Sequence, residues 1–172
     1  MSATLKANNP DQGCRSWAFD FVEAGALLSA IVRVAHPDLY DAGLIAFMEM
    51  HNIPEVAECL QCWSSIFSAI SVIANRESPI HRDAGTRSEW YDFLVSIGGD
   101  PDTRMVWPSL GVQLAYTSGT GVLFSGYCIP HGVGKSKADR VCIAGYMKDN
   151  VHERFHVRAP GWMNIEMYDN VD

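Results

Sequence analysis

The sequence has 172 residues, of which 48% are hydrophobic and 19% charged, a composition typical of one globular domain and not of a disordered chain. Its net charge of -7 is unevenly spread: residues 1–75 contain 3 basic and 8 acidic side chains, whereas residues 76–158 contain 10 and 9. The lack of a strong basic field argues against tight, sequence-independent binding of nucleic acid, but it does not exclude a nucleic-acid substrate.

The first third of the chain has helical periodicity. Apolar residues recur at helical spacing over 16–35, with Ser16 as a candidate N-cap and Pro37 as the stop. A second helix is expected from about Asp38 to just before Pro54, and a third over 54–63, where Pro54 suits the first helical position. Together they predict a helical segment over residues 1–62.

After Trp63 the pattern changes to short apolar runs separated by glycine and proline. We expect strands at 65–75, near 81–83, and at 90–97, 103–107, 110–116, 121–133 and 140–147. Such regular short strands are typical of a sandwich or barrel, of which the double-sheet jelly roll is one form. The prediction is a single α+β domain over 1–172: a helical N-terminal third, a mainly β jelly-roll core (double-stranded β-helix) over 63–158, and a C-terminal cap over 159–172.

The cysteines and the N-terminus bear on the compartment. The 5 cysteines follow no regular spacing, and residues 1–13 lack the basic and apolar regions of a signal peptide. No apolar run reaches the length of a membrane span. We therefore expect a reduced intracellular protein that does not act in a membrane.

The segment Ser78-Pro79-Ile80-His81-Arg82-Asp83 contains the first candidate metal ligands. In an extended backbone, residues two apart point to the same side, so His81 and Asp83 converge. An imidazole and a carboxylate are two thirds of the facial triad that binds non-heme Fe(II). Taken alone, the triplet is weak evidence for a metal site and favours a surface turn in which Asp83 pairs with Arg82 or Arg87.

Two later residues complete a four-part pattern. His131, in a predicted strand, is the candidate third ligand, and Arg140 opens the next strand nine residues later. A guanidinium there can bind a carboxylate through two parallel hydrogen bonds. This order of residues within a β-rich region is the one that Fe(II)- and 2-oxoglutarate-dependent oxygenases use.

The amino-acid sequence also resembles that of the TET/JBP-like group of these oxygenases, particularly its short fungal members. The resemblance rests on SPIHRDAGTRSEWYDFLVSIGG and HGVGKSKADRVCIAGYMKDNVHERFHVRAPGWM and covers roughly residues 63–163. It implies that His81, Asp83 and His131 bind iron and that Arg140 anchors 2-oxoglutarate, with O₂ as co-substrate. It also implies a contact of Asn75 with 2-oxoglutarate. Some relatives have serine two residues after this arginine, where Cys142 is a weaker hydrogen-bond donor.

The resemblance further implies a substrate. The expected reaction is oxidation of the methyl group of 5-methylcytosine, thymine or another methylated base, flipped out of a duplex or taken from a single strand. A DNA substrate would place the protein in the nucleus, and any other substrate in the cytoplasm. The alternatives are the same iron chemistry on a small molecule or protein side chain, and a binding module that has lost catalysis.

The predicted strand at 90–97 has two faces. Tyr91, Phe93, Val95 and Ile97 share one face, which we expect to be core. Asp92 lies on the other face and is a candidate substrate contact near the metal, or alternatively the partner of a neighbouring arginine. Trp107 and Trp162 are candidates for stacking a base, although single tryptophans more often pack in a core or at a rim.

Three further motifs suggest other chemistry. His152-Glu153-Arg154-Phe155-His156 matches the H-E-x-x-H of zinc metalloproteases, but Pro160 leaves little room for the helix that this motif needs. Cys59 and Cys62 form a C-x-x-C without a second pair, so two buried thiols on one helix face are expected. Gly134-Lys135-Ser136 ends like a P-loop, but Ile129 stands where the first glycine is required, which excludes it.

Overall fold

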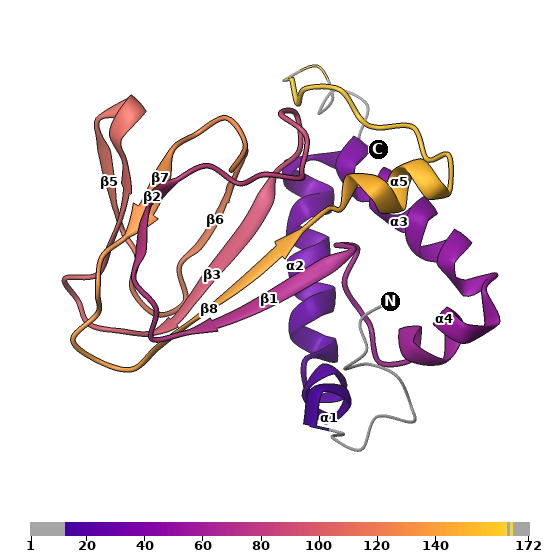
Figure 1. Cartoon of the computed structure of the whole chain (residues 1–172), viewed down its shortest axis with the longest axis horizontal. Helices are drawn as coiled ribbons and strands as arrows, with labels where there is room; N and C mark the ends of the chain where they lie inside the picture. The colour runs from indigo at the N-terminus through magenta and orange to yellow at the C-terminus, as the bar shows by residue number, and fades with distance from the viewer. Residues whose placement is uncertain (1–12, 165, 167–172) are drawn as a thin grey trace. The chain divides into compact units, whose positions relative to one another are not determined.

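The structure is a computed structural model that describes residues 13–164 and 166. The described residues form two compact units, a β unit of residues 69–149 and a helical unit made of the residues before and after it (Figure 1). Each unit is considered by itself. The predicted grouping into one domain over 1–172 stays a prediction.

The helical unit contains the helices of the N-terminal third and one near the C-terminus. They are α1 (Gly13–Asp20), α2 (Val22–Ala35), α3 (Pro37–His51), α4 (Pro54–Leu60) and α5 (Asp149–Arg154). The start of α3 shows why the chain turns where it does: the Nδ1 atom of His36 accepts a hydrogen bond from the backbone N–H of Leu39 at 3.3 Å, and Pro37 occupies the first turn.

The helical prediction is confirmed with three adjustments. Ser16, the candidate N-cap, lies inside α1. The single helix expected over 16–35 is divided at Phe21 into α1 and α2, although the backbone N–H of Phe21 still bonds to the carbonyl of Trp17 at 2.9 Å. The third helix is shorter than expected, because α4 ends at Leu60 and not at residue 63. No helix in the described ranges has the length and apolar character needed to cross a bilayer.

The β unit consists of eight strands in two four-stranded antiparallel sheets (Figure 1). The first sheet has the order β1-β8-β3-β6 and the second the order β2-β7-β4-β5. Apart from the β4–β5 hairpin, successive strands alternate between the sheets, which is the jelly-roll arrangement that the sequence predicts. The bounds are β1 (Ala69–Ala74), β2 (Ser78–His81), β3 (Asp92–Gly98), β4 (Arg104–Trp107), β5 (Val112–Ala115), β6 (Gly121–Phe124), β7 (His131–Val133) and β8 (Arg140–Tyr146).

The expected continuous segment over 121–133 is divided between the two sheets. β6 ends at Phe124 and β7 begins at His131, because the backbone N–H groups of Cys128 and Ile129 both bond to the carbonyl of Ser125 and close a tight turn. His131 therefore opens a strand of the second sheet. This turn moves His131 across the fold to the sheet that also contains His81.

The sequence predicted that the face of β3 with Phe93 and Ile97 lies in the core, and this prediction was wrong for part of that face. Phe93 is buried, but Ile97 is 46% exposed. The opposite face contains the fully buried side chains: Asp92 and Ser96 are 3% and 0% exposed. The inner face of β3 is thus the more polar one, and its buried polar residues indicate a site between the sheets. The apolar core of the β unit is built from Met105, Tyr116, Phe124 and Val133.

Candidate metal centre

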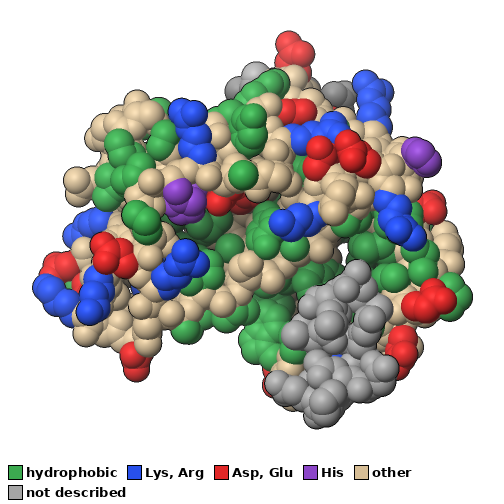
Figure 2. All heavy atoms as spheres, viewed as in Figure 1, with side chains coloured by type: hydrophobic (Ala, Val, Ile, Leu, Met, Phe, Trp, Pro, Cys, Tyr) green, Lys and Arg blue, Asp and Glu red, His purple; other side chains and the backbone are tan. Residues whose placement is uncertain are grey.

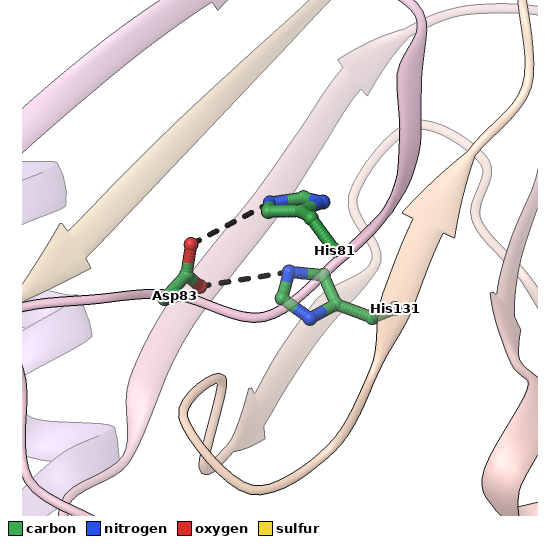
Figure 3. Close-up of side chains that lie close together, drawn as sticks. All are labelled: His81, Asp83 and His131. Atoms are coloured by element: carbon green, nitrogen blue, oxygen red, sulfur yellow. Dashed lines mark ion pairs between the residues drawn. The ribbon is translucent and has the colours of Figure 1, made fainter.

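Three side chains of the β unit converge on one point (Figure 3). His81 ends β2, Asp83 follows two residues later, and His131 begins the neighbouring β7. The Asp83 carboxylate lies between the rings, with Oδ1 3.5 Å from His81 Nε2 and Oδ2 3.6 Å from His131 Nε2. In the described part of the chain, this is the one group of three or more such side chains close enough to share a metal ion.

The backbone orients both imidazoles in the same way. His81 Nδ1 lies 2.8 Å from the carbonyl of Pro79, and His131 Nδ1 lies 3.0 Å from the carbonyl of Ile129. With the proton on Nδ1 donated to a carbonyl, Nε2 presents its lone pair toward Asp83, as in metal sites whose ligand histidines are oriented by a second hydrogen bond. Burial lowers the pKa of His131, which favours the neutral ring that binds a metal.

A glycine in the turn before β7 allows the carboxylate to sit there. The carbonyl of Gly126 accepts the backbone N–H of Asp83 at 3.0 Å. A Cβ on Gly126 would lie 2.3 Å from Asp83 Oδ2 and 2.5 Å from Asp92 Oδ2. The alternative in which Asp83 pairs with Arg82 or Arg87 is not formed: the two Asp83 oxygens lie against His81 and His131, and Arg87 Nε bonds to Asp149 Oδ1 at 2.6 Å.

The three residues open into a cavity of about 250 Å³ between the sheets of the β unit. Its first-sheet wall follows β8, where alternate residues from Arg140 to Tyr146 face inward together with Asp92 and Leu94 of β3. Arg140 begins β8 and Tyr146 ends it. We call the end of the cavity at Arg140 the cationic end and the end at Tyr146 the distant end. The histidines enter from the facing sheet.

Arg140 is a buried cation without an acidic partner among the described residues. Its side chain is 5% exposed, its Nε–H donates to Ser96 Oγ at 3.0 Å, and its guanidinium lies 4.7 Å from the centre of the Tyr116 ring. A buried guanidinium normally requires an anion, because desolvation of an unpaired charge is costly. The arrangement therefore suits a ligand carboxylate bound from the cavity.

Asn75, the expected contact of 2-oxoglutarate, lies beside the backbone of Arg140. It is exposed, does not line the cavity, and exchanges hydrogen bonds with the backbone of Arg140: its Oδ1 accepts the Arg140 N–H at 2.8 Å, and its own N–H donates to the Arg140 carbonyl at 2.8 Å. Its Nδ2 donates to Asp139 Oδ1 at 3.0 Å. The structure thus brings Asn75 to the backbone of Arg140 and not to the cavity.

Cys142 and Tyr116 complete the cationic end. Both line the cavity, and the Tyr116 hydroxyl lies 3.5 Å from Cys142 Sγ. Burial, together with Cys142, raises the pKa of Tyr116, so its hydroxyl keeps its proton. The phenol is therefore a hydrogen-bond donor beside Arg140, next to the weak donor Cys142.

Asp92 lies close to the candidate ligands. Burial raises its pKa to about 7, with the charge of Asp83 as the second cause, while the backbone N–H of Gly126 and the charge of Lys148 act in the opposite direction. The approach of the Gly126 N–H falls short of a hydrogen bond, and neither Asp92 oxygen has another partner. The alternative in which Asp92 pairs with an arginine is not formed by any described residue.

The competing motifs lie elsewhere or lack the required structure. Helix α5 ends at Arg154, and His156 lies beyond it with a φ of 53°, so His152 and His156 do not share a helix face. Cys59 and Cys62 are buried thiols, as expected, but they do not share a helix face, because α4 ends at Leu60. Trp107 packs on Phe124, whereas Trp162 is 56% exposed.

Sequence patterns missed three residues that shape this site: Ser96, Tyr116 and Gly126. Ser96 and Tyr116 act on Arg140 through strand pairing and packing that join distant segments. Gly126 could have been found from the sequence, because it lies in the short turn before His131. A glycine in such a turn indicates that two chain segments approach each other closely.

Comparison with known families agrees with the geometry. The model of the Tet_JBP family, described as the oxygenase domain of the 2OGFeDO superfamily, matches residues 16–149. No curated protein matches the sequence well enough to be called a relative. Enzymes of this superfamily use Fe(II) and 2-oxoglutarate, and the His81-Asp83-His131 group together with Arg140 provides donors suited to both. The chain belongs to the Tet_JBP family of 2-oxoglutarate-dependent Fe(II) dioxygenases.

Proposed function

We propose that His81, Asp83 and His131 bind Fe(II), that Arg140 binds the distal carboxylate of 2-oxoglutarate, and that the enzyme oxidises the methyl group of a methylated nucleobase of the 5-methylcytosine type in nucleic acid. The observation that carries the proposal is that Arg140, buried and without an acidic partner among the described residues, lines the same cavity as the three candidate ligands.

The iron and its co-substrate supply the oxidation of an unactivated C–H bond, and the protein supplies binding and orientation. The hydrogen bonds from Nδ1 hold the rings of His81 and His131 so that both Nε2 atoms face Asp83. Ser96 holds the guanidinium of Arg140 through its Nε atom. That contact leaves the terminal nitrogens of Arg140 for a carboxylate, while Tyr116 presents a protonated hydroxyl beside them.

The distant end of the cavity is where we place the substrate. Asp92, Tyr146 and Lys148 line that end. We assign Asp92 as a substrate contact, because a buried carboxyl group without hydrogen bonds gains a partner when a ligand with a donor enters. Asn75 is assigned the role of positioning Arg140, and any contact with 2-oxoglutarate would be indirect.

A nucleic-acid substrate would be held weakly by this chain alone. On the face of the molecule seen in Figure 2, acidic and basic side chains are intermixed over the β unit and no extended basic patch is visible. Weak electrostatic binding suits a flipped or single-stranded base delivered with the help of a partner. If the substrate is DNA, the enzyme acts in the nucleus. The same charge pattern and the small cavity favour a second candidate, oxidation of a small molecule or protein side chain in the cytoplasm.

The test is release of succinate from 2-oxoglutarate by enzyme loaded anaerobically with Fe(II), with and without DNA that contains 5-methylcytosine. His81→Ala and Arg140→Ala are the variants. Turnover that requires both residues and rises with methylated DNA supports the proposal in full. Turnover that is indifferent to DNA retains the site and moves the substrate to the second candidate. A lack of turnover in iron-loaded wild-type enzyme would contradict the assignment of the site.

A further inference from the structure

The side chain of His131 contacts aromatic rings from both sheets of the β unit. The ring of Phe124, the last residue of β6, lies edge to face against the His131 ring, with centroids 4.8 Å apart and planes at 80°. The ring of Trp107, the last residue of β4, lies 5.0 Å from that of Phe124. With His81, whose ring lies 4.5 Å from that of His131, these side chains form a continuous row of four rings.

The two histidines of this row are held to different degrees. Each has a contact between its Nδ1 atom and a backbone carbonyl, but the side chain of His81 is 43% exposed and that of His131 only 4%. One hydrogen bond fixes one atom of an imidazole and lets the ring turn about that atom. The torsion that turns a histidine ring has broad preferences, so it does not set the plane of the ring by itself. For His131, the contact with Phe124 limits this rotation.

Trp107 packs on Phe124 although one of its polar groups is unsatisfied. The indole N–H of Trp107 is buried and has no hydrogen-bond partner among the described residues. Buried tryptophans usually find an acceptor for this group, because an unsatisfied donor is unfavourable. The Trp107 side chain is thus held by packing alone, against Phe124 and the core that contains Met105 and Val133. A tryptophan kept in this way indicates that the packing of its ring is what the site requires.

We infer that Phe124 is a positioning residue for the metal centre. It fixes the plane of the His131 ring, so that Nε2 faces Asp83 before a metal binds. Trp107 in turn holds the ring of Phe124. Groups that orient a metal ligand raise the affinity for the metal, because the ligand loses less freedom on binding. The inference rests on the proposed function, since it takes His131 as a metal ligand.

Titration calorimetry of the metal-free proteins with manganese(II) tests this role. Phe124→Leu removes the ring and keeps an apolar side chain. Phe93→Leu is the matched control, because Phe93 is 2% exposed, Phe124 is 4% exposed, and the two lie on opposite faces of the same sheet. Phe124→Leu should bind manganese(II) about tenfold more weakly than the wild type, whereas Phe93→Leu should stay within about twofold of it. Both should lower the melting temperature of the metal-free protein, so lost stability alone does not explain a difference in affinity.

Trp107→Leu provides a second measurement that does not require Phe124→Leu to fold. Trp107 is only partly buried, so its replacement disturbs the core less. The variant keeps the contact between Phe124 and His131 but lets the Phe124 ring move. We expect it to bind manganese(II) about threefold more weakly than the wild type, an effect of the size that one aromatic pair contributes.

The affinities also show which part of the argument fails. Wild-type affinity in Phe124→Leu, or in Trp107→Leu if the first variant does not fold, would overturn the inference and leave the proposed ligands intact. Equal losses in Phe124→Leu and Phe93→Leu would overturn it too, because they would reflect a general loss of packing. If His131→Ala binds manganese(II) as tightly as the wild type, His131 is not a ligand, and the proposed site fails together with the inference.

Discussion

His81 and His131 are directly opposed across the β2–β7 pair, with their ring centroids 4.5 Å apart. The pairing aims one ring from each strand at Asp83, and both rings are held by a carbonyl two residues upstream. Two imidazoles and a carboxylate on one side of a point leave the other side open for ligands, which is the geometry of the facial triad.

The opposed pair predicts that a divalent metal stabilises the protein and that His131 is required for this. Manganese(II) at about 100 times its dissociation constant should add roughly 2.7 kcal/mol, which raises the melting temperature by about 5–10 °C. In His131→Ala the rise should vanish, because one of three ligands is lost. Differential scanning fluorimetry with and without manganese(II) measures it.

The buried His152 of the H-E-x-x-H motif is the control for this experiment. His152→Ala should lower the melting temperature of the metal-free protein, since a buried side chain is lost, but it should keep the full rise on addition of metal. A rise that survives in His131→Ala and disappears in His152→Ala would mean that the metal binds at the other motif.

Gly126 gives a second prediction. The Cβ of Gly126→Ala would come within 2.5 Å of carboxylate oxygens of both Asp83 and Asp92, so both carboxylates or the backbone of residue 126 must move. Displacement of groups that hold a metal ligand typically lowers metal affinity by about 10- to 100-fold. Calorimetric titration with manganese(II) measures the change. Gly134→Ala is the matched control, because its Cβ would meet nothing within 4 Å, and its affinity should equal that of the wild type.

The sequence was informative where the chemistry is local. His81 and Asp83 are two residues apart, and the glycines and prolines between short apolar runs marked most strands correctly, so the candidate metal ligands and the jelly roll could be predicted. The division of 121–133 was missed, because its apolar run continues through a turn that is fixed by Ser125. A local pattern does not record which sheet a strand joins.

The hydrogen bond between Arg140 and Ser96 could not be predicted either, because it depends on which strands pair. Ser96 lies directly opposite Cys142 in the pairing of β3 with β8, a register set by residues 42 or more positions apart in the chain. Likewise, Ile97 was expected in the core from strand alternation, yet alternation alone does not say which face a sheet buries. Non-local pairing decides both.

Arg140 and Ser96 give a prediction that separates binding from chemistry. Ser96→Ala removes the acceptor of the Arg140 Nε–H and should raise the KM for 2-oxoglutarate about fivefold, the effect of roughly 1 kcal/mol, with kcat nearly unchanged. Arg140→Lys keeps the charge but loses the planar guanidinium that binds a carboxylate through two hydrogen bonds, so the KM for 2-oxoglutarate should rise more than tenfold. Steady-state kinetics with varied 2-oxoglutarate measures both. A fall in kcat at constant KM would show that Ser96 does not act by positioning Arg140.

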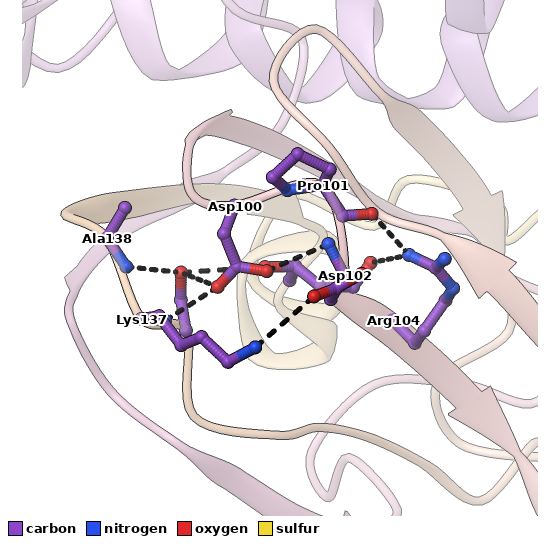
Figure 4. A network of polar contacts seen from close by, with 8 residues as sticks. Asp100, Pro101, Asp102, Arg104, Lys137 and Ala138 are labelled. Atoms are coloured by element: carbon purple, nitrogen blue, oxygen red, sulfur yellow. Dashed lines mark hydrogen bonds and ion pairs between the residues drawn. The ribbon is translucent and has the colours of Figure 1, made fainter.

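The loop after β3 predicts a dependence of stability on pH. The carboxylate of Asp100 accepts hydrogen bonds from the backbone N–H groups of Lys137 and Asp102, at 2.6 and 2.8 Å, and from the Ser136 hydroxyl at 3.1 Å (Figure 4). These bonds, the one from the Lys137 N–H first, lower the pKa of Asp100 below its usual value of 3.8. The loop that precedes Arg140 is thereby tied to the end of β3.

Because the folded-state pKa is the lower one, the unfolded chain takes up a proton first as the pH falls. The stability contributed by Asp100 is therefore complete above pH 4 and is lost as the pH falls through its folded pKa. Asp100→Asn should lower the free energy of unfolding at pH 7, and its difference from the wild type should shrink below pH 4. Asp102→Asn breaks only the exposed ion pair with Lys137 and should be nearly neutral throughout. Urea unfolding of the three proteins between pH 3 and 7 measures these differences, and a gap between Asp100→Asn and the wild type that stays constant over this range would show that the carboxylate charge is not what holds the loop.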